Sequence, residues 1–110
     1  MAHIRLCATH DIANNQSRGF SPDGGPLQEI FVVNHAGQFH AYRNQCPHTG
    51  ATLNWQDDQF LDISQQLIQC SVHGALFRIS DGFCLRGPCA RQSLIPCNIE
   101  IINDGIFLVD

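Results

Sequence analysis

An all-β fold is predicted for this chain from three features of its sequence. Its apolar runs are short and are broken by Gly, Pro and Asp. No window of 12 or more residues repeats apolar residues with the 3.6-residue period of a helix. Near the end of the chain, an alternating segment (residues 97–101) and an apolar run (residues 106–109) flank an Asp-Gly pair, which is a strong hairpin signal. With 110 residues, 44% of them hydrophobic, the chain suits one domain with one core.

The first half of the chain predicts three strands. Residues 3–8 alternate loosely and form a first strand, and residues 11–27 are rich in Asn, Ser, Gly and Pro, which predicts a long loop. Residues 29–34 (EIFVVN) are β-branched and apolar on both faces, as in a buried strand. A turn at residues 34–37 leads into a strand over residues 38–43.

Alternation within residues 38–43 predicts Phe39 and Ala41 on one face, with His40 and Tyr42 on the other. The middle of the chain, residues 44–93, predicts many short strands, as in a sandwich or barrel. At the end, residues 97–101 and 106–109 form two strands of a hairpin turned by residues 103–105.

Charge and the N-terminal sequence exclude several classes of function. The formal net charge is −4 and the six basic residues are scattered arginines, which argues against nucleic-acid binding. The sequence has no apolar leader segment and no run of about 18 apolar residues, so we expect no membrane association. We therefore expect a cytoplasmic protein, whose six cysteines stay reduced.

Two cysteine–histidine pairs carry the chemistry. Cys46-Pro47-His48 and Cys70-Ser71-Val72-His73 are separated by the 21 residues 49–69, and a glycine follows each pair. Such a set can hold a structural zinc ion, can hold a [2Fe–2S] cluster with thiolates on one iron and imidazoles on the other, or can be unrelated residues. Glycine lets a backbone approach a bound group closely, which favours the cluster over zinc only slightly.

The segments around these pairs resemble a known family. CPHTGATL (residues 46–53) and CSVHGALF (residues 70–77) resemble the two cluster-binding loops of the Rieske family, and residues 86–89 resemble its proline loop. Residues 94–109 resemble its closing hairpin. The resemblance implies one Rieske [2Fe–2S] domain over residues 1–110, a sandwich or incomplete barrel with a small cluster-binding subdomain whose loops lie within about residues 44–90.

The same resemblance implies the ligands and the redox behaviour. Cys46 and Cys70 would bind the inner iron, and His48 and His73 the outer iron through Nδ1. Cytochrome bc-type relatives have a loop disulfide where this chain has Ala51 and Val72. They also have hydroxyl donors where it has Ala75 and Phe77. Without those donors the potential is expected near the low end of the Rieske range, roughly −150 mV, as in a soluble Rieske-type ferredoxin.

The function expected from these features is one-electron transfer. A reductase would load the cluster and an oxygenase or another redox enzyme would accept the electron. The chain itself is not expected to be an enzyme, because it has no G-x-G-x-x-G dinucleotide motif and no room for a non-haem iron domain. Two alternatives stay open, a small Rieske-like subunit of a nitrite-reductase type of enzyme and a structural zinc module.

The other reactive side chains are predicted to be structural. The four remaining cysteines are interpreted as packing residues, although Cys89 could lie near the cluster and could pair with Cys84. The remaining histidines are expected on the surface or in strands, and three aspartates are expected to be solvated. Asp81-Gly82 predicts a turn. These sets are Cys7, Cys84, Cys89 and Cys97; His3, His10, His35 and His40; and Asp57, Asp58 and Asp62.

Overall fold

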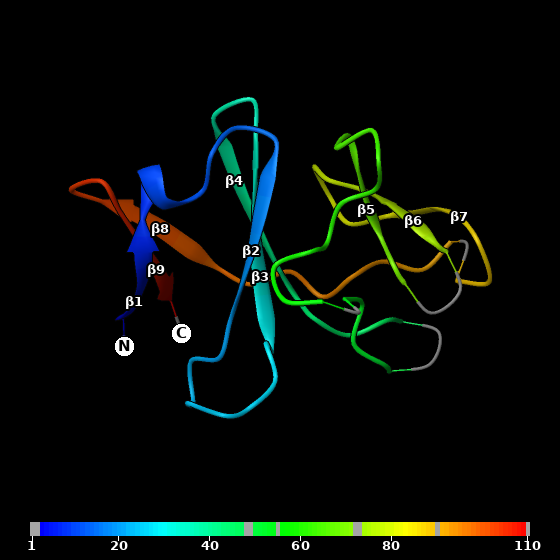
Figure 1. The fold of residues 1–110 in the computed structure, drawn as a ribbon, viewed down its shortest axis with the longest axis horizontal. Coiled ribbons are helices and arrows are strands. Elements are labelled where there is room, and N and C mark those ends of the chain that lie inside the picture. The colour runs from blue at the N-terminus through cyan, green and yellow to red at the C-terminus, as the bar shows by residue number, and fades with distance from the viewer. Residues whose placement is uncertain (1–2, 48–49, 55, 72–73, 90, 110) are drawn as a thin grey trace.

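The computed structural model describes residues 3–47, 50–54, 56–71, 74–89 and 91–109. Within these residues the chain forms nine strands and one short 3₁₀ helix (Figure 1). This confirms the predicted all-β class. The elements are β1 (His3–Ala8), η1 (Thr9–Asp11), β2 (Gln16–Phe20), β3 (Ile30–His35), β4 (Gln38–Arg43), β5 (Leu67–Gln69), β6 (Leu76–Arg78), β7 (Cys84–Arg86), β8 (Ile99–Ile102) and β9 (Gly105–Val109).

The strands build three small antiparallel sheets in the part of the chain described. Their orders are β1-β9-β8, β2-β3-β4 and β5-β6-β7, and the second sheet lies between the other two (Figure 1). Two separate groups of buried side chains fill the two interfaces that this arrangement creates. None of the described helical turns is long and apolar enough to cross a bilayer.

Strand β3 is the shared wall of both cores. Phe31 and Val33 belong to the core beneath β5-β6-β7, whereas Val32 belongs to the core beneath β1-β9-β8. Successive side chains of a strand point to opposite faces, so burial on both faces calls for the consecutive apolar residues Ile30–Val33. The run that predicted a buried strand therefore reflects burial on both faces, with all three residues 0% exposed.

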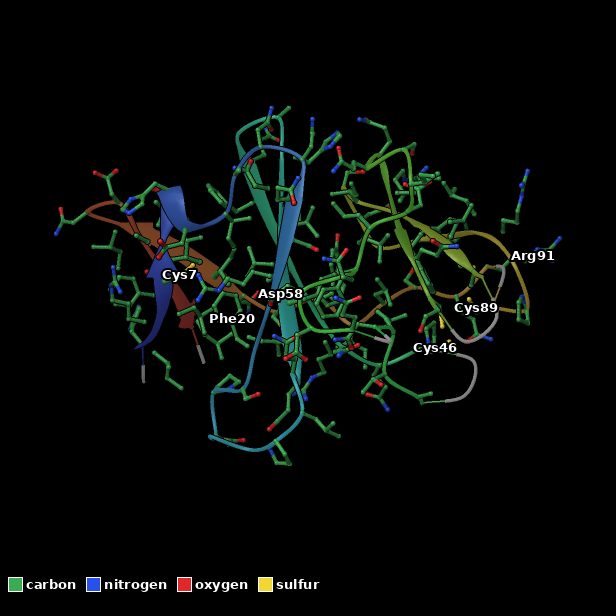
Figure 2. All side chains as sticks on the ribbon, viewed as in Figure 1. Cys7, Phe20, Cys46, Asp58, Cys89 and Arg91 are labelled. Atoms are coloured by element: carbon green, nitrogen blue, oxygen red, sulfur yellow. The ribbon has the colours of Figure 1, made fainter. Side chains whose placement is uncertain are left out.

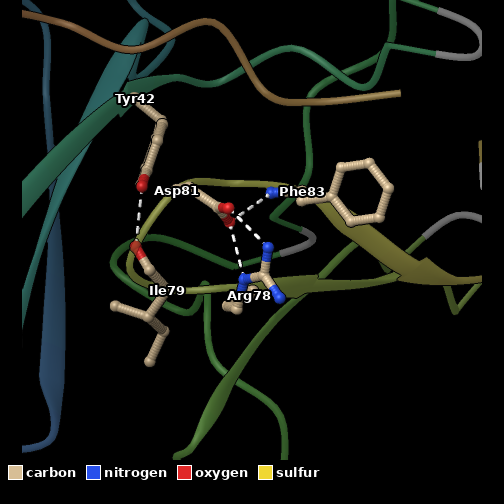
Figure 3. A network of polar contacts seen from close by, with 5 residues as sticks. All are labelled: Tyr42, Arg78, Ile79, Asp81 and Phe83. Atoms are coloured by element: carbon tan, nitrogen blue, oxygen red, sulfur yellow. Dashed lines mark hydrogen bonds and ion pairs between the residues drawn. The ribbon is translucent and has the colours of Figure 1, made fainter. Parts of the chain in front are cut away.

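Strand β4 also divides its side chains as predicted. Ala41 and Phe39 pack in the core beneath β1-β9-β8, and Tyr42 packs in the core beneath β5-β6-β7. The Tyr42 hydroxyl donates a hydrogen bond to the Ile79 carbonyl (2.6 Å), which ties the central sheet to the sheet of β5-β6-β7 (Figure 3). Desolvation by burial, followed by the charge of Asp81, raises the pKa of Tyr42 to about 12. This hydroxyl therefore stays a hydrogen-bond donor across the physiological range.

The prediction of an unbroken loop over residues 11–27 is wrong, because β2 lies inside it. Strand β2 has the sequence QSRGF and pairs with β3 from Gln16↔Asn34 to Phe20↔Ile30. Strand β2 lies at the edge of its sheet, where polar residues are tolerated. Its sequence therefore shows no hydrophobic pattern that would predict a strand. Contacts from outside the hairpin hold it, among them the Gly19 N–H donating to Asp58 Oδ1 (2.8 Å).

The predicted closing hairpin is present. β8 and β9 pair antiparallel, with Ile102 opposite Gly105. The turn residues are Asn103 and Asp104, with φ of 48° and 63°, so Gly105 begins the strand rather than forming the turn. Two consecutive positive φ values fit the type I′ turn whose twist matches a two-residue hairpin.

The predicted turn at Asp81-Gly82 joins β6 to β7. Asp81 accepts hydrogen bonds from Arg78 Nε (2.9 Å) and from the Phe83 N–H (3.0 Å), as Figure 3 shows. Gly82 has a φ of 73°, and a Cβ there would come within 2.9 Å of the Tyr42 ring. The position thus needs glycine for both its backbone and its packing.

We predict that the Arg78→Gln substitution raises the pKa of Asp81 from about 2 toward its ordinary value of 3.8, because the hydrogen bond from Arg78 is the main cause of the depression. The depressed carboxyl supports folding above about pH 4, and that support is lost as the pH falls through about 2. Carboxyl ¹³C NMR titration measures both values. Arg91→Gln is the control, and a parent Asp81 that titrates near 3.8 contradicts the assignment.

Candidate metal centre

The first cysteine motif forms a closed loop directly after β4. The Cys46 N–H donates to the Ala51 carbonyl (2.7 Å), and the Gly50 N–H donates to the Cys46 carbonyl (2.7 Å). Gly50 has a φ of 78°, a left-handed conformation that favours glycine. The loop therefore closes on its own backbone and begins with a cysteine that is 2% exposed.

The second cysteine motif repeats this closure after β5. The Cys70 N–H donates to the Ala75 carbonyl (2.9 Å), and the Gly74 N–H donates to the Cys70 carbonyl (2.8 Å). Gly74 also lies in the left-handed region, with φ of 68°. Both loops thus connect a cysteine to the glycine four residues later and to the alanine five residues later. The two motifs, which differ in histidine spacing, share these two closing hydrogen bonds and a left-handed glycine.

The structure brings the two predicted cysteine ligands into one environment. Cys46 and Cys70 belong to the same buried core, where Cys70 is 0% exposed. His48 and His73, the two predicted imidazole ligands, lie outside the described residues. The described donor set fits an iron–sulfur cluster, because buried thiolates on backbone-closed loops are its usual anchors. Among the described residues, no group of three or more His, Cys, Asp or Glu side chains could hold a metal ion.

Leu53 links the two loops through its peptide groups. Its N–H donates to Asn44 Oδ1 (2.6 Å), and its carbonyl accepts from the Ser71 N–H (2.8 Å). Asn44 stands two residues before the first cysteine, and Ser71 follows the second cysteine. Leu53 is 0% exposed, so both bonds satisfy buried backbone groups.

Sequence reasoning missed the role of Asn44. Its side chain is 6% exposed and also donates to the Gln28 carbonyl and to Asn54 Oδ1, both at 2.7 Å. The polar atoms of a buried asparagine side chain need hydrogen-bond partners. The position of Asn44 in the sequence does not show which residues these partners are. Through these bonds the base of the first loop is tied to the segment before β3.

The structure corrects two of the three predicted solvated aspartates. Asp62 is partly buried and its Oδ1 accepts from the Leu67 N–H (3.2 Å). Asp58 is also partly buried, and its Oδ1 accepts from the Gly19 N–H (2.8 Å) and from Gln28 Nε2 (2.9 Å). The Ser17 hydroxyl donates to its carbonyl (2.7 Å). Asp58 therefore fastens the segment that follows the first loop to edge strand β2, at the centre of the molecule in Figure 2.

The predicted proline loop packs against the second cysteine loop. Gly87 has a φ of 111°, and a Cβ there would lie 2.8 Å from the Ala75 Cα. No side chain fits that space without moving backbone. Because the Ala75 carbonyl accepts the Cys70 N–H, the proline loop rests on a residue that fixes a predicted ligand.

The remaining cysteines pack inside the protein, as predicted, and the Sγ atoms of Cys84 and Cys89 are also in contact, at 2.9 Å. Cys7, Cys84 and Cys89 are buried, and Cys97 is partly buried. Burial, then the neighbouring Cys84, then the charge of Cys46 raise the pKa of Cys89 to about 12. Figure 2 shows Cys46 and Cys89 at the same end of the molecule.

Comparison with known proteins gives matches over most of the chain. A family model described as Rieske [2Fe-2S] domain matches residues 2–102. The ferredoxin component of the p-cumate 2,3-dioxygenase system of Pseudomonas putida is 33% identical over 86 residues, which are 78% of this chain and 68% of that protein. Apoptosis-inducing factor 3 of Mus musculus is 34% identical over 77 residues, which are 70% of this chain.

The lengths of these relatives differ widely. The chain spans 11% of apoptosis-inducing factor 3, one of the first curated relatives it matches. Among solved structures, the ferredoxin of carbazole 1,9a-dioxygenase from Nocardioides aromaticivorans IC177 aligns with a TM-score of 0.77 at 19% identity, covering 99% of this chain and 98% of that one. At that identity the likeness shows the fold alone.

We predict that Asn44→Ala lowers the free energy of unfolding by about 1–3 kcal/mol, because it leaves the buried Leu53 N–H without an acceptor. Equilibrium urea unfolding measures the change. Gln45→Ala is the matched control, since Gln45 is the exposed neighbour and its loss should stay within about 0.5 kcal/mol. Equal effects of the two substitutions would remove Asn44 from this role.

Proposed function

The chain belongs to the Rieske [2Fe–2S] domain family, which carries one [2Fe–2S] cluster, and on that premise we propose that it is a one-electron carrier of the ferredoxin type. The observation that carries the proposal is the pair of equivalent backbone-closed loops, each beginning with a buried cysteine. The four proposed ligands are Cys46, His48, Cys70 and His73.

When bound, the cluster would accept and release one electron through its iron atoms. The protein would hold it with two thiolates in the core and two imidazoles from the loops, a set that raises the potential above that of an all-cysteine cluster. Exposed loop residues support access by a partner. Gly50, Ser71 and Gly74 are exposed, and a Cβ at Gly74 would meet no atom within 4 Å.

The proposed partners are a reductase that donates the electron and an oxygenase that accepts it. Support comes from the relative of Pseudomonas putida, which is the ferredoxin component of a dioxygenase system and shares most of its length with this chain. We place the carrier in the cytoplasm, because both cysteine loops need reduced thiols.

The buried surroundings of the second loop support a low potential. Ala75 and Phe77 are both 0% exposed and offer no hydroxyl to the bound group. Donors aimed at cluster sulfurs stabilise the added electron and raise the potential. Two apolar side chains at these positions suit a donor of electrons to an oxygenase.

We predict that the purified protein is red-brown and that, after dithionite reduction, its EPR signal has an average g below that of all-cysteine [2Fe–2S] clusters. His73→Ala should abolish the signal, because it removes a ligand. His40→Ala, in strand β4, is the control and should leave the signal intact. A colourless, zinc-loaded protein after anaerobic reconstitution with iron and sulfide would instead make the chain a structural zinc module.

We also predict that Ala75→Ser and Phe77→Tyr each raise the midpoint potential, because each supplies a hydroxyl donor near the proposed cluster. Spectroelectrochemical titration measures the shift. Ala41→Ser is the matched control, since Ala41 is 5% exposed but belongs to the other core. An unchanged potential in the double variant, or an equal rise in the control, would refute the donor argument.

A further inference from the structure

Two thiols outside the proposed ligand set lie in contact. Cys84 in β7 and Cys89 after the following turn have their Sγ atoms 2.9 Å apart, and their exposures are 1% and 0%. The backbone between them doubles back, because Cys84 N–H donates to the Gln92 carbonyl (2.8 Å) and Gln92 N–H donates to the Cys89 carbonyl (2.9 Å). The two sulfurs therefore face each other from opposite limbs of one short loop.

A backbone carbonyl lies within hydrogen-bond reach of the pair. The Cys84 thiol donates to the Arg86 carbonyl (3.3 Å). In the contact between the two sulfurs either thiol can be the donor. The thiol pair thus supplies the Arg86 carbonyl with a donor from inside the loop.

We propose that Cys84 and Cys89 are a modification site at which an oxidant of the peroxide class converts the two thiols into a disulfide. A disulfide bond is about 2.05 Å long, so the sulfurs need to approach by less than about 1 Å. The four residues between them are exposed, with Leu85 at 48%, so local opening of this surface loop admits a small oxidant.

The chemistry balances with hydrogen peroxide as the oxidant. One sulfur attacks a peroxide oxygen, the O–O bond breaks, and a sulfenic acid and one water form. The second sulfur then attacks the sulfenic sulfur, the S–O bond breaks, and a second water leaves. Two thiols are oxidised by two electrons, and one peroxide is reduced to two waters. Because both thiols are buried and the thiolate is the reactive form, the reaction is slow.

Formation of the disulfide would alter two contacts that lead to the proposed cluster loop. This part of the proposal rests on the proposed function. The disulfide removes the hydrogen that Cys84 gives to the Arg86 carbonyl, which frees the backbone next to Gly87. Gly87 has no spare room against Ala75, whose carbonyl accepts the Cys70 N–H. A shift of this turn therefore moves the residue that orients Cys70.

Trypsin digestion tests the disulfide directly. Cleavage after Arg78, Arg86 and Arg91 places the two cysteines on separate peptides, residues 79–86 and 87–91. The holo-protein is treated with hydrogen peroxide, its remaining thiols are alkylated, and the digest is examined by mass spectrometry. We expect the two peptides to be joined and to separate after dithiothreitol treatment.

Three variants control this experiment. Cys84→Ser and Cys89→Ser should each abolish the cross-link, and Cys97→Ser, which changes a cysteine of the other core, should retain it. A digest without the joined peptides, or one that joins Cys89 to Cys46 instead, would overturn the proposal. Accumulation of sulfinic acid on either residue without a cross-link would overturn it as well.

The midpoint potential tests the coupling separately. We expect the potential of the peroxide-treated protein to shift and to return after dithiothreitol, with no such shift in Cys84→Ser. A cross-link that forms without any shift would overturn the coupling to Cys70. A colourless protein that still forms the cross-link would overturn the proposed electron-carrier function and leave the modification site in place.

Discussion

The two cysteine loops are held in register by the peptide groups of one residue, Leu53. One of its hydrogen bonds ends on Asn44, just before the first loop, and the other begins at Ser71, inside the second. Because Leu53 is completely buried, neither bond can be exchanged for water, and breaking either leaves a buried polar group without a partner. This bridge supports a site that needs one thiolate from each loop, because each of the described closing bonds lies within a single loop.

The residues on either side of this bridge are fixed to the central sheet. Asn44 follows β4 directly, and its second set of bonds reaches Gln28, just before β3. Phe60, after the first loop, stacks on Phe31 of β3 with ring centroids 4.3 Å apart. The segment that carries the first loop is therefore anchored to the central sheet at its beginning by hydrogen bonds and at its end by aromatic packing.

Sequence patterns were informative where burial or local turn chemistry decides the structure. Strand β3 was predicted because two-faced burial leaves an unbroken apolar run, and the closing hairpin because its turn needs special backbone angles. Strand β2 was missed, since a polar edge strand is stabilised by partners distant in sequence, such as Asp58. The cysteine loops could be predicted from their motifs, but the role of Asn44 could not, because its partners come together only in three dimensions.

At Ala75 the backbone contacts that hold the loop are independent of whether the side chain donates a hydrogen bond to the bound group. Its backbone holds the second loop, through the carbonyl that accepts the Cys70 N–H, and its Cα fills the space that keeps position 87 a glycine. Neither task uses the side chain beyond requiring that it be small. A serine could therefore take this position and keep both backbone contacts, so the residue chosen here is free to set the hydrogen bonding around the bound group. Alanine at this site offers the bound group no hydroxyl donor, and the low potential that we propose follows from that absence.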